Sequence, residues 1–338
     1  MKLKINIFLS FAMGCMIASS LEAAYTIKNG KLLEMAEVAT MSVQEHYSAA
    51  SNAYQSEKWD DLVRQANIII KNFPASPFVH ESLFFLGSGN FHLQELEDAD
   101  EYLSRYLKKQ AACQYFEQAI GLRLAIAEAF RQGSKKHLFG VGALPRWIPA
   151  GDDALSIYEE IISALPHHDI AARALFGKGM ILTQRDDFSL ANETMQNLIR
   201  RFPKHVLATD GYVEICRNYL KQAKTTFPNP DFLELAEINL SKFQDNFPGD
   251  AKLEEAHQLF QEMQEFYAGH LYETAQFFER TKKPQAARLY YMKLAHRYPS
   301  THAAQLAREK LGQAGNVVSS SLPAPSVQPV ADSLQPHE

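Results

Sequence analysis

The sequence is poor in cysteine, in long apolar stretches and in clusters of basic residues. Its 338 residues include three cysteines, so a disulfide-bonded framework is not expected. No apolar run approaches the roughly 20 residues that a membrane-spanning helix requires. The net charge is -5, from 34 basic and 39 acidic side chains. This balance argues against nucleic-acid binding, because a phosphate backbone requires clustered Lys and Arg.

Signatures of enzymes and of metal sites are also missing. No His-Glu-x-x-His, Gly-x-Ser-x-Gly, phosphate-loop or dinucleotide-binding motif occurs. The densest metal-like cluster, Pro166-His167-His168-Asp169, lacks the helical spacing of paired ligands, and we expect a turn in which Asp169 caps the next helix. We therefore predict a protein that is not an enzyme, with no catalytic residue, no metal and no cofactor.

The first 20 residues have the pattern of an export signal. Two lysines precede an apolar run at 5–13 that is too short to span a bilayer. Residues 12–15 resemble a lipobox, in which Cys15 would become lipid-modified and N-terminal, and cleavage within 18–23 is the alternative. The mature protein is thus expected to be exported, either anchored by lipid at Cys15 or released in soluble form.

The segments that flank the central part of the chain differ from it in composition. Residues 21–43 form an N-terminal lead, and 313–338 are rich in proline and serine without any aromatic residue. A segment of that kind cannot bury enough apolar surface to order itself. We predict that 313–338 is a disordered tail.

What the sequence has in abundance is a repeated interval. A small residue is followed twelve positions later by another small residue or by a proline, several times along the chain. Two helices need a small residue where their backbones approach closely, and proline ends the second helix, so the interval predicts stacked helical hairpins. The small positions are Gly87, Ala99, Ala154, Gly179, Ala191, Ala236, Ala275 and Ala287, and the prolines are Pro74, Pro166, Pro203, Pro248 and Pro299.

This pattern is that of tetratricopeptide repeats. We predict an all-α tetratricopeptide-repeat superhelix (an α-solenoid) over 44–312, with about six hairpins, a closing helix and nothing strand-like. An insertion at 132–151, rich in glycine and proline, is expected to be a surface loop. The expected hairpins are 44–74, 78–111, 113–166, 170–203, 206–248 and 270–299, with a lead-in helix at 251–268 and a closing helix at 301–312.

Stacked hairpins usually present a groove to another protein, so aromatic and amide side chains on the first helix of each hairpin are candidates for binding. Tyr54, Asn90 and Phe91 are such candidates. Phe84 and Phe85, by contrast, are expected to fill the core.

Several of these residues resemble the BamD-type (YfiO-like) lipoproteins of the β-barrel assembly machinery. The resemblance rests on Lys58-Trp59 with the Phe-Pro-x-x-Pro-Phe run at 73–78, on the Phe-Gly-Val loop at 139–141, and on the stretch 270–301. The lipobox-like cysteine fits it as well. Residues 167–248 depart from it, because they add hairpins beyond the usual five of that family.

The resemblance implies a non-enzymatic scaffold anchored by lipid at the periplasmic face of the outer membrane. In that family the N-terminal repeats are thought to receive unfolded outer membrane protein precursors, and the C-terminal repeats to dock the outer-membrane subunit of the assembly machinery. Phe139 and Val141 of the inserted loop therefore join the candidates for partner binding.

Two other classes of protein share parts of the pattern. Periplasmic coordinators linked to the Tol–Pal system also carry Phe-Pro-x-x-Pro repeats, but they usually lack the Phe-Gly-Val insertion and often begin with a coiled coil. Lytic transglycosylases use superhelical α-domains, but between Gly312 and Glu338 we expect no room for a catalytic domain.

Overall fold

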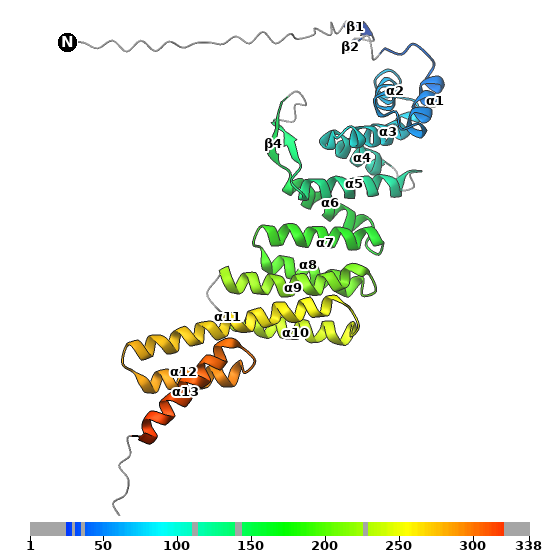
Figure 1. Ribbon diagram of the computed structural model, residues 1–338. Helices are drawn as coiled ribbons and strands as arrows, with labels where there is room; N and C mark the ends of the chain where they lie inside the picture. The colour runs from blue at the N-terminus through cyan, green and yellow to red at the C-terminus, as the bar shows by residue number, and fades with distance from the viewer. Residues whose placement is uncertain are drawn as a thin grey trace, which may run out of the picture. The chain divides into compact units, whose positions relative to one another are not determined.

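The computed structural model confirms the predicted class, an all-α solenoid of helical hairpins (Figure 1). Its described residues contain thirteen helices and two short antiparallel ribbons. The chain divides into two compact units, Met1–Arg123 and Leu124–Glu338, and the division falls within one helix, α5. The residues that the structure describes are 25–28, 31–34, 38–109, 114–138, 144–225 and 229–320.

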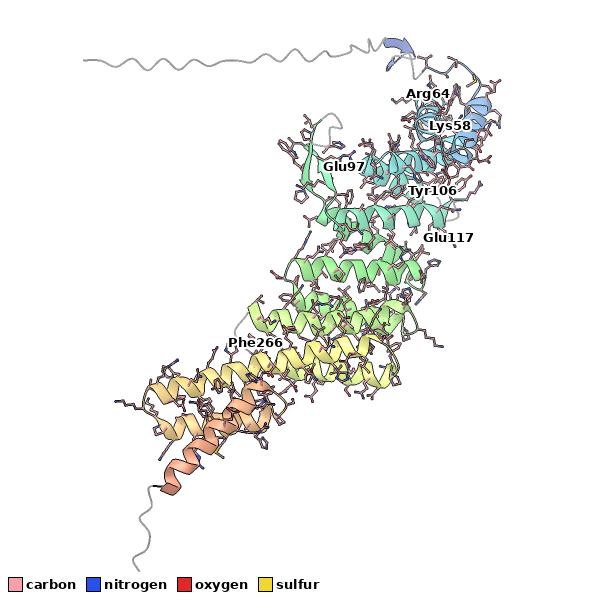
Figure 2. The ribbon with its side chains drawn as sticks, in the orientation of Figure 1. Lys58, Arg64, Glu97, Tyr106, Glu117 and Phe266 are labelled. Carbon is pink, nitrogen blue, oxygen red and sulfur yellow. The ribbon has the colours of Figure 1, made fainter. Side chains whose placement is uncertain are left out.

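Unit 1 contains one ribbon, two complete hairpins and the start of α5. Its helices pack in chain order, α1 on α2, α2 on α3 and α3 on α4, and α1 also contacts α3 (Figure 1). Tyr106 on α4 is fully buried in this packing (Figure 2). The elements are β1 (Tyr25–Lys28), β2 (Lys31–Glu34), α1 (Val43–Gln55), α2 (Trp59–Asn72), α3 (Phe78–His92), α4 (Leu96–Lys109) and α5 (Phe116–Arg131).

Unit 2 continues the same arrangement. The first helices of its successive hairpins contact one another, α7 with α9 and α9 with α11, and each also packs on its own second helix. After the second half of α5, the elements are β3 (Lys135–His137), β4 (Arg146–Pro149), α6 (Gly151–Ala164), α7 (Asp169–Gln184), α8 (Phe188–Arg201), α9 (Val206–Thr225), α10 (Asp231–Asn246), α11 (Lys252–Arg280), α12 (Pro284–Arg297) and α13 (His302–Ser320).

Helix bounds differ from the expected ones in two places. The lead-in helix and the first helix of the last hairpin form one continuous helix, α11, of 29 residues, because its two halves contact different partners: α9 and α10 on one side, α12 and α13 on the other. Helix α13 continues to Ser320, beyond the expected end at Gly312. The expected disordered tail lies outside the described residues from 321 onward.

The insertion at 132–151 is a β-ribbon in its described part, which corrects the prediction of an irregular loop without strands. Lys135 pairs with Pro149 and His137 with Arg146, and the register shifts between them, so Trp147 is the extra residue of a bulge. All four residues of β4 are exposed, and the Trp147 side chain is 67% exposed.

Each proline of the repeat follows directly on the residue that ends a second helix. The residue two positions after the proline lies at the start of the next helix or one residue before its N-cap, and its side chain accepts a hydrogen bond from a backbone N–H of the first turn. The cap of α7 is His168, one residue before the predicted Asp169. The five residues that accept such a bond are Ser76, His168, His205, Asp250 and Thr301.

The turn histidines also connect neighbouring repeats. His205 accepts the N–H of Leu207 at its Nδ1 (3.0 Å), so its Nε2 carries the proton that it donates to the Asp169 carboxylate at 2.8 Å. Residues 166–169, which were predicted to form a turn between repeats, thus also take part in a contact between neighbouring repeats. No group of three or more His, Cys, Asp or Glu residues in the described part of the chain is placed to hold a metal ion.

Two of the predicted small positions, both glycines, lie where helices approach closely, and the others are buried. A Cβ on Gly87 would meet Leu103 Cγ at 2.5 Å, and one on Gly179 would meet Met195 Cε at 2.5 Å. In both cases the contacted residue lies on the second helix of the same hairpin, one turn after the small residue of that second helix. The alanines at the equivalent positions are Ala99, Ala154, Ala191, Ala236 and Ala275, each 0% exposed, and Ala287, 2% exposed.

Candidate functional site

Unit 1 has a recess on the side of the first helices of its hairpins, which we call the N-terminal groove. Its volume is about 470 Å³. Helices α1, α3 and the unit 1 part of α5 contribute side chains, and the turn between α1 and α2 closes one end. The lining residues are Tyr54, Gln55, Glu57, Trp59, Ser88, His92, Gln118, Gly121 and Leu122.

The turn between α1 and α2 determines where Trp59 lies. Glu57 takes up a left-handed conformation (φ 55°), and the N–H of Lys58 donates to the carbonyl of Ala53 at 2.9 Å. Lys58 ends this turn (Figure 2), and α2 starts with Trp59. The indole then stacks on the His92 imidazole at the end of α3, with ring centroids 3.9 Å apart and planes 10° apart.

Tyr54 is held by a cluster of aromatic side chains. Its ring meets Phe84 edge-on at 5.7 Å and lies 5.5 Å from Phe85 and 6.3 Å from Tyr115. Phe84 and Phe85 are fully buried, as expected for core residues. The half-buried Tyr54 therefore presents a fixed aromatic edge to the groove and needs little ordering when a ligand binds.

The opposite wall of the groove is open down to the backbone. A Cβ on Gly121 of α5 would meet nothing within 4 Å. Gln55 and Gln118 are exposed and carry amide groups that can donate and accept hydrogen bonds. An aromatic wall that faces amides and an accessible backbone suits an extended peptide, because its backbone groups and its side chains both find partners.

Burial alters the acid–base properties of the groove. It raises the pKa of the Tyr54 hydroxyl above its ordinary value, so this group stays protonated and can donate a hydrogen bond. It lowers the pKa of His92, against the opposing pull of the nearby Glu57 carboxylate. The imidazole is therefore neutral at pH 7, and the groove carries one formal charge, that of Glu57.

The predicted binding residues of unit 1 lie in different environments. Tyr54 lines the groove. Asn90 does not: it is 7% exposed, and its amide donates to the Leu86 carbonyl of its own helix at 2.9 Å. Asn90 precedes His92 by two residues and therefore lies about 200° around the helix from it. It is on the face of α3 that packs against the rest of the unit. Phe91 is half-buried and meets the His92 ring edge-on at 5.3 Å.

The remaining predicted site residues lie outside the described part of the chain. They are Phe139 and Val141 of the inserted loop and Cys15, the expected lipid anchor. The ribbon that leads to this loop is described, and Leu144 and Ile148 are each 37% exposed beside the exposed Trp147.

Trp59 and His92 are groove residues that sequence reasoning missed. Trp59 is one of the residues that carry the family resemblance, and the sequence predicts no role in binding for it. The sequence contains a signal that could have found them. The turns after α1 and α3 occupy equivalent places in consecutive hairpins, and each has an aromatic ring beside it. Among the described residues, no helix combines the length and the apolar character needed to cross a bilayer.

The chain contains a recognisable tetratricopeptide repeat. Residues 173–205, which include most of α7 and all of α8, match the family model described as tetratricopeptide repeat. This match covers one repeat within unit 2. No curated protein matches the chain.

Among solved structures, a tetratricopeptide repeat protein from Thermus thermophilus is 14% identical, with a TM-score of 0.31 over 64% of this chain and 98% of that one. One from Parabacteroides merdae is 14% identical, with a TM-score of 0.37 over 79% and 96%. PilW, described as a type IV pilus biogenesis factor, is 13% identical, with a TM-score of 0.30 over 79% and 99%. At these values the likenesses carry no argument about function.

Proposed function

We propose that this protein is an exported, non-enzymatic scaffold that binds segments of other proteins and that serves the assembly of β-barrel proteins into the outer membrane. The observation that carries the proposal is the N-terminal groove, in which fixed rings of Tyr54, Trp59 and His92 face amides and an open stretch of backbone. The sequence resemblance to BamD-type lipoproteins supports the same role.

In this proposal the groove receives unfolded precursors of outer membrane proteins. Such segments alternate apolar and polar side chains, since one face of each strand will meet lipid, and they carry aromatic side chains where the strand crosses the membrane interfaces. Their aromatic side chains would stack on the Tyr54 and Trp59 rings, and their backbone would bond to the amides of Gln55 and Gln118. Later repeats would contact the outer-membrane subunit of the assembly machinery, and a lipid on Cys15 would hold the protein at the membrane.

The groove can be tested by site-specific crosslinking in cells. A photo-crosslinking amino acid at Gln118, inside the groove, should form adducts with newly made barrel precursors. The same amino acid at Arg64, whose side chain is 56% exposed on α2 outside the groove, serves as the control. Equal labelling at both positions would contradict a specific groove.

A blocking variant tests the same site without moving the crosslinker. Gly121→Leu should fill the groove while favouring the helix, because the space beside Gly121 is open. Gly121→Ala adds a single methyl group and is the matched control. We expect crosslinking at Gln118 to be lost in Gly121→Leu and kept in Gly121→Ala.

The partner and the anchor need separate experiments. Purification from detergent-solubilised envelopes should recover the outer-membrane subunit of the barrel-assembly machinery, and recovery of Tol–Pal components alone would replace the proposal with an envelope-coordinating role. Labelling with a palmitate analogue should mark the wild type and not Cys15→Ala. An unlabelled wild type would mean ordinary signal cleavage and a soluble periplasmic protein.

A further inference from the structure

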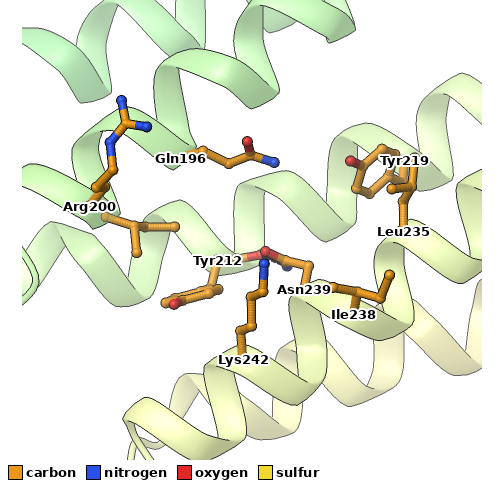
Figure 3. A pocket seen from close by; sticks show the side chains of 9 residues that line it. Gln196, Arg200, Tyr212, Tyr219, Leu235, Ile238, Asn239 and Lys242 are labelled. Carbon is orange, nitrogen blue, oxygen red and sulfur yellow. Dashed lines mark hydrogen bonds between the residues drawn. The ribbon is translucent and has the colours of Figure 1, made fainter.

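A second groove lies in unit 2, between the second helices α8 and α10, and we call it the basic groove (Figure 3). Its floor is α9, which contacts both of these helices. Its volume is about 310 Å³. The lining residues are Gln196, Ile199, Arg200, Tyr212, Tyr219, Leu235, Ile238, Asn239 and Lys242.

The preceding repeat has the same recess, between α6 and α8 over α7, which we call the acidic groove. When the buried alanines Ala154, Ala191 and Ala236 are aligned, the walls of the two grooves fall on the same helical positions. The lining residues of the acidic groove are Glu159, Ile162, Ser163, Leu175, Lys178, Leu190, Glu193, Thr194 and Asn197.

Equivalent positions of the two grooves carry side chains that differ in charge and polarity. Arg200 stands where the acidic groove has Ser163, and Lys242 where it has Asn197. Ile238 stands where it has Glu193. The basic groove thus has two cations and no acidic lining residue, in a chain whose net charge is -5.

The cations of the two grooves also differ in their partners. In the acidic groove, Lys178 pairs with Glu159 at 2.7 Å, so its charge is neutralised within the groove. In the basic groove, neither Arg200 nor Lys242 forms an ion pair with any described residue, and Arg200 has a hydrogen bond to the Asn197 amide oxygen at 3.3 Å. Both cations are exposed and available to an anionic ligand.

The floor of the basic groove is rigid. Tyr212 stacks on Phe243 at 5.0 Å with planes 2° apart, and its hydroxyl accepts a hydrogen bond from Asn246 at 3.0 Å. Asn239 donates to the Tyr212 carbonyl at 2.9 Å. The recess therefore exists before any ligand binds, which lowers the entropic cost of binding.

The wall formed by α10 has an apolar ridge above this floor. Leu235 is 43% exposed and Ile238 is 52% exposed. With Lys242 they lie at i, i+3 and i+7, on one face of the helix (Figure 3). A ligand that fits must bring apolar groups to the ridge and negative charge to the two cations.

We propose that the basic groove binds a short protein segment in which acidic residues flank leucine-like apolar residues. The argument is charge complementarity: carboxylates of the segment pair with Arg200 and Lys242, and its apolar side chains cover Leu235 and Ile238. Arg200 and Lys242 lie on different helices, so the segment crosses from α8 to α10. This surface belongs to unit 2 and does not depend on the N-terminal groove.

The test is selection of a random peptide library displayed on phage against the immobilised full chain. We expect enriched peptides that combine Asp or Glu with Leu, Ile or Phe. A labelled consensus peptide should bind about tenfold more weakly to Arg200→Ser/Lys242→Asn, which carries the residues of the acidic groove, as expected for the loss of two exposed ion pairs. Ile238→Glu should abolish binding, and both losses should be visible by fluorescence anisotropy.

Two controls separate the groove from general charge. Lys178→Asn/Lys204→Asn removes the same number of positive charges outside the basic groove and should bind the peptide normally. Gly121→Leu, which blocks the N-terminal groove, should also bind it normally, so failure of the proposed function and failure of this proposal are distinguishable. Circular dichroism of each variant establishes that its helices are intact.

Several outcomes would overturn the proposal. These are the absence of enrichment, enrichment of basic peptides, or a consensus peptide that binds Arg200→Ser/Lys242→Asn as well as the wild type. Binding to phosphatidylglycerol vesicles that this variant loses, without peptide binding, would assign the groove to a membrane surface. A concentration-dependent dimer in sedimentation equilibrium that the variant loses would assign it to a second copy of this chain.

Discussion

Gly87 and Leu103 show how closely the two helices of one hairpin approach. A Cβ at position 87 would lie 2.5 Å from Leu103 Cγ and 3.2 Å from the Leu103 backbone nitrogen. The first neighbour is the branch point of a fully buried side chain and the second is backbone, so neither can move aside at little cost. Steric crowding therefore explains why position 87 is a glycine. The interval of twelve residues between small residues is the trace of such close approaches in the sequence.

We predict that Gly87→Ala lowers the free energy of unfolding by about 1–3 kcal/mol, the usual cost of overpacking. Gly121→Ala, in the same unit, should raise it by about 0.5–1 kcal/mol, since the added methyl meets nothing within 4 Å and alanine favours the helix. Urea unfolding followed by circular dichroism measures both. Equal effects of the two substitutions would contradict the packing argument.

The stack of Trp59 on His92 makes the N-terminal groove sensitive to pH. Burial holds the pKa of His92 below its ordinary 6.5 in the folded protein, so the unfolded chain binds a proton here more readily than the folded one. Stability contributed at this site is therefore present above pH 6.5 and is lost below it, as the pH falls toward the lowered pKa of the folded protein.

This can be followed by fluorescence, because the chain has two tryptophans, Trp59 and Trp147. In Trp147→Phe the emission comes from Trp59 alone, and a protonated imidazole stacked on it should quench that emission. We predict a quenching transition with its midpoint below pH 6.5 that disappears in His92→Gln. A midpoint above 6.5 would show that burial does not control this histidine.

Among the elements, α11 differs most from its expected extent, since one helix replaces two. A break was expected between 268 and 270, where Gly269 stands, a residue type that disfavours a helix interior. A Cβ at Gly269 would meet nothing within 4 Å, so the glycine is not required by packing, and contacts of both halves of α11 with other helices keep it continuous. Tertiary packing outweighs a local preference of about 1 kcal/mol.

Two substitutions at Gly269 test whether continuity matters. Gly269→Ala should raise the free energy of unfolding by about 0.5–1 kcal/mol, because it removes the cost of glycine in a helix. Gly269→Pro should lower it by about 3 kcal/mol or more, since proline removes one helical hydrogen bond and clashes with the preceding turn. If the proline variant were as stable as the wild type, the two halves of α11 would be independent helices.

Helix positions were predictable because small residues mark close helix contacts and prolines mark helix ends, and both constraints act between residues that are near in sequence. The ribbon in the insertion was not, since its strands have three and four residues and the bulge at Trp147 disrupts any alternation. The groove was only partly predictable: Tyr54 was found, but Asn90 faces the core. Which face of α3 is open depends on the neighbours around that helix, and the sequence of α3 alone does not encode it.

At the scale of the whole molecule, each hairpin is stabilised by its immediate neighbours. Contacts between helices connect elements that are near one another in the chain, as in other repeat proteins, and the chain separates into two compact units. A defect in one unit should therefore spread to adjacent hairpins and stop before it reaches hairpins several repeats away.

Phe243 offers the sharpest test of this locality. It is fully buried in unit 2, where its ring stacks on Tyr212 and lies 6.1 Å from Phe247. Phe243→Ala should cost about 3–5 kcal/mol, because it removes the ring and leaves a cavity. Hydrogen exchange followed by mass spectrometry should show faster exchange in α9, α10 and the first half of α11, with no change in α1 to α4.

The converse variant gives the control. Leu62→Ala, in the core of unit 1 and also 0% exposed, should accelerate exchange in α1 to α4 and leave α9 to α11 as they are. If either substitution accelerated exchange evenly along all the described helices, the chain would unfold as one cooperative body. In that case a ligand bound in either groove would slow exchange in both units, because both units share one unfolding equilibrium. Separate responses would instead confine that stabilisation to the unit that holds the groove.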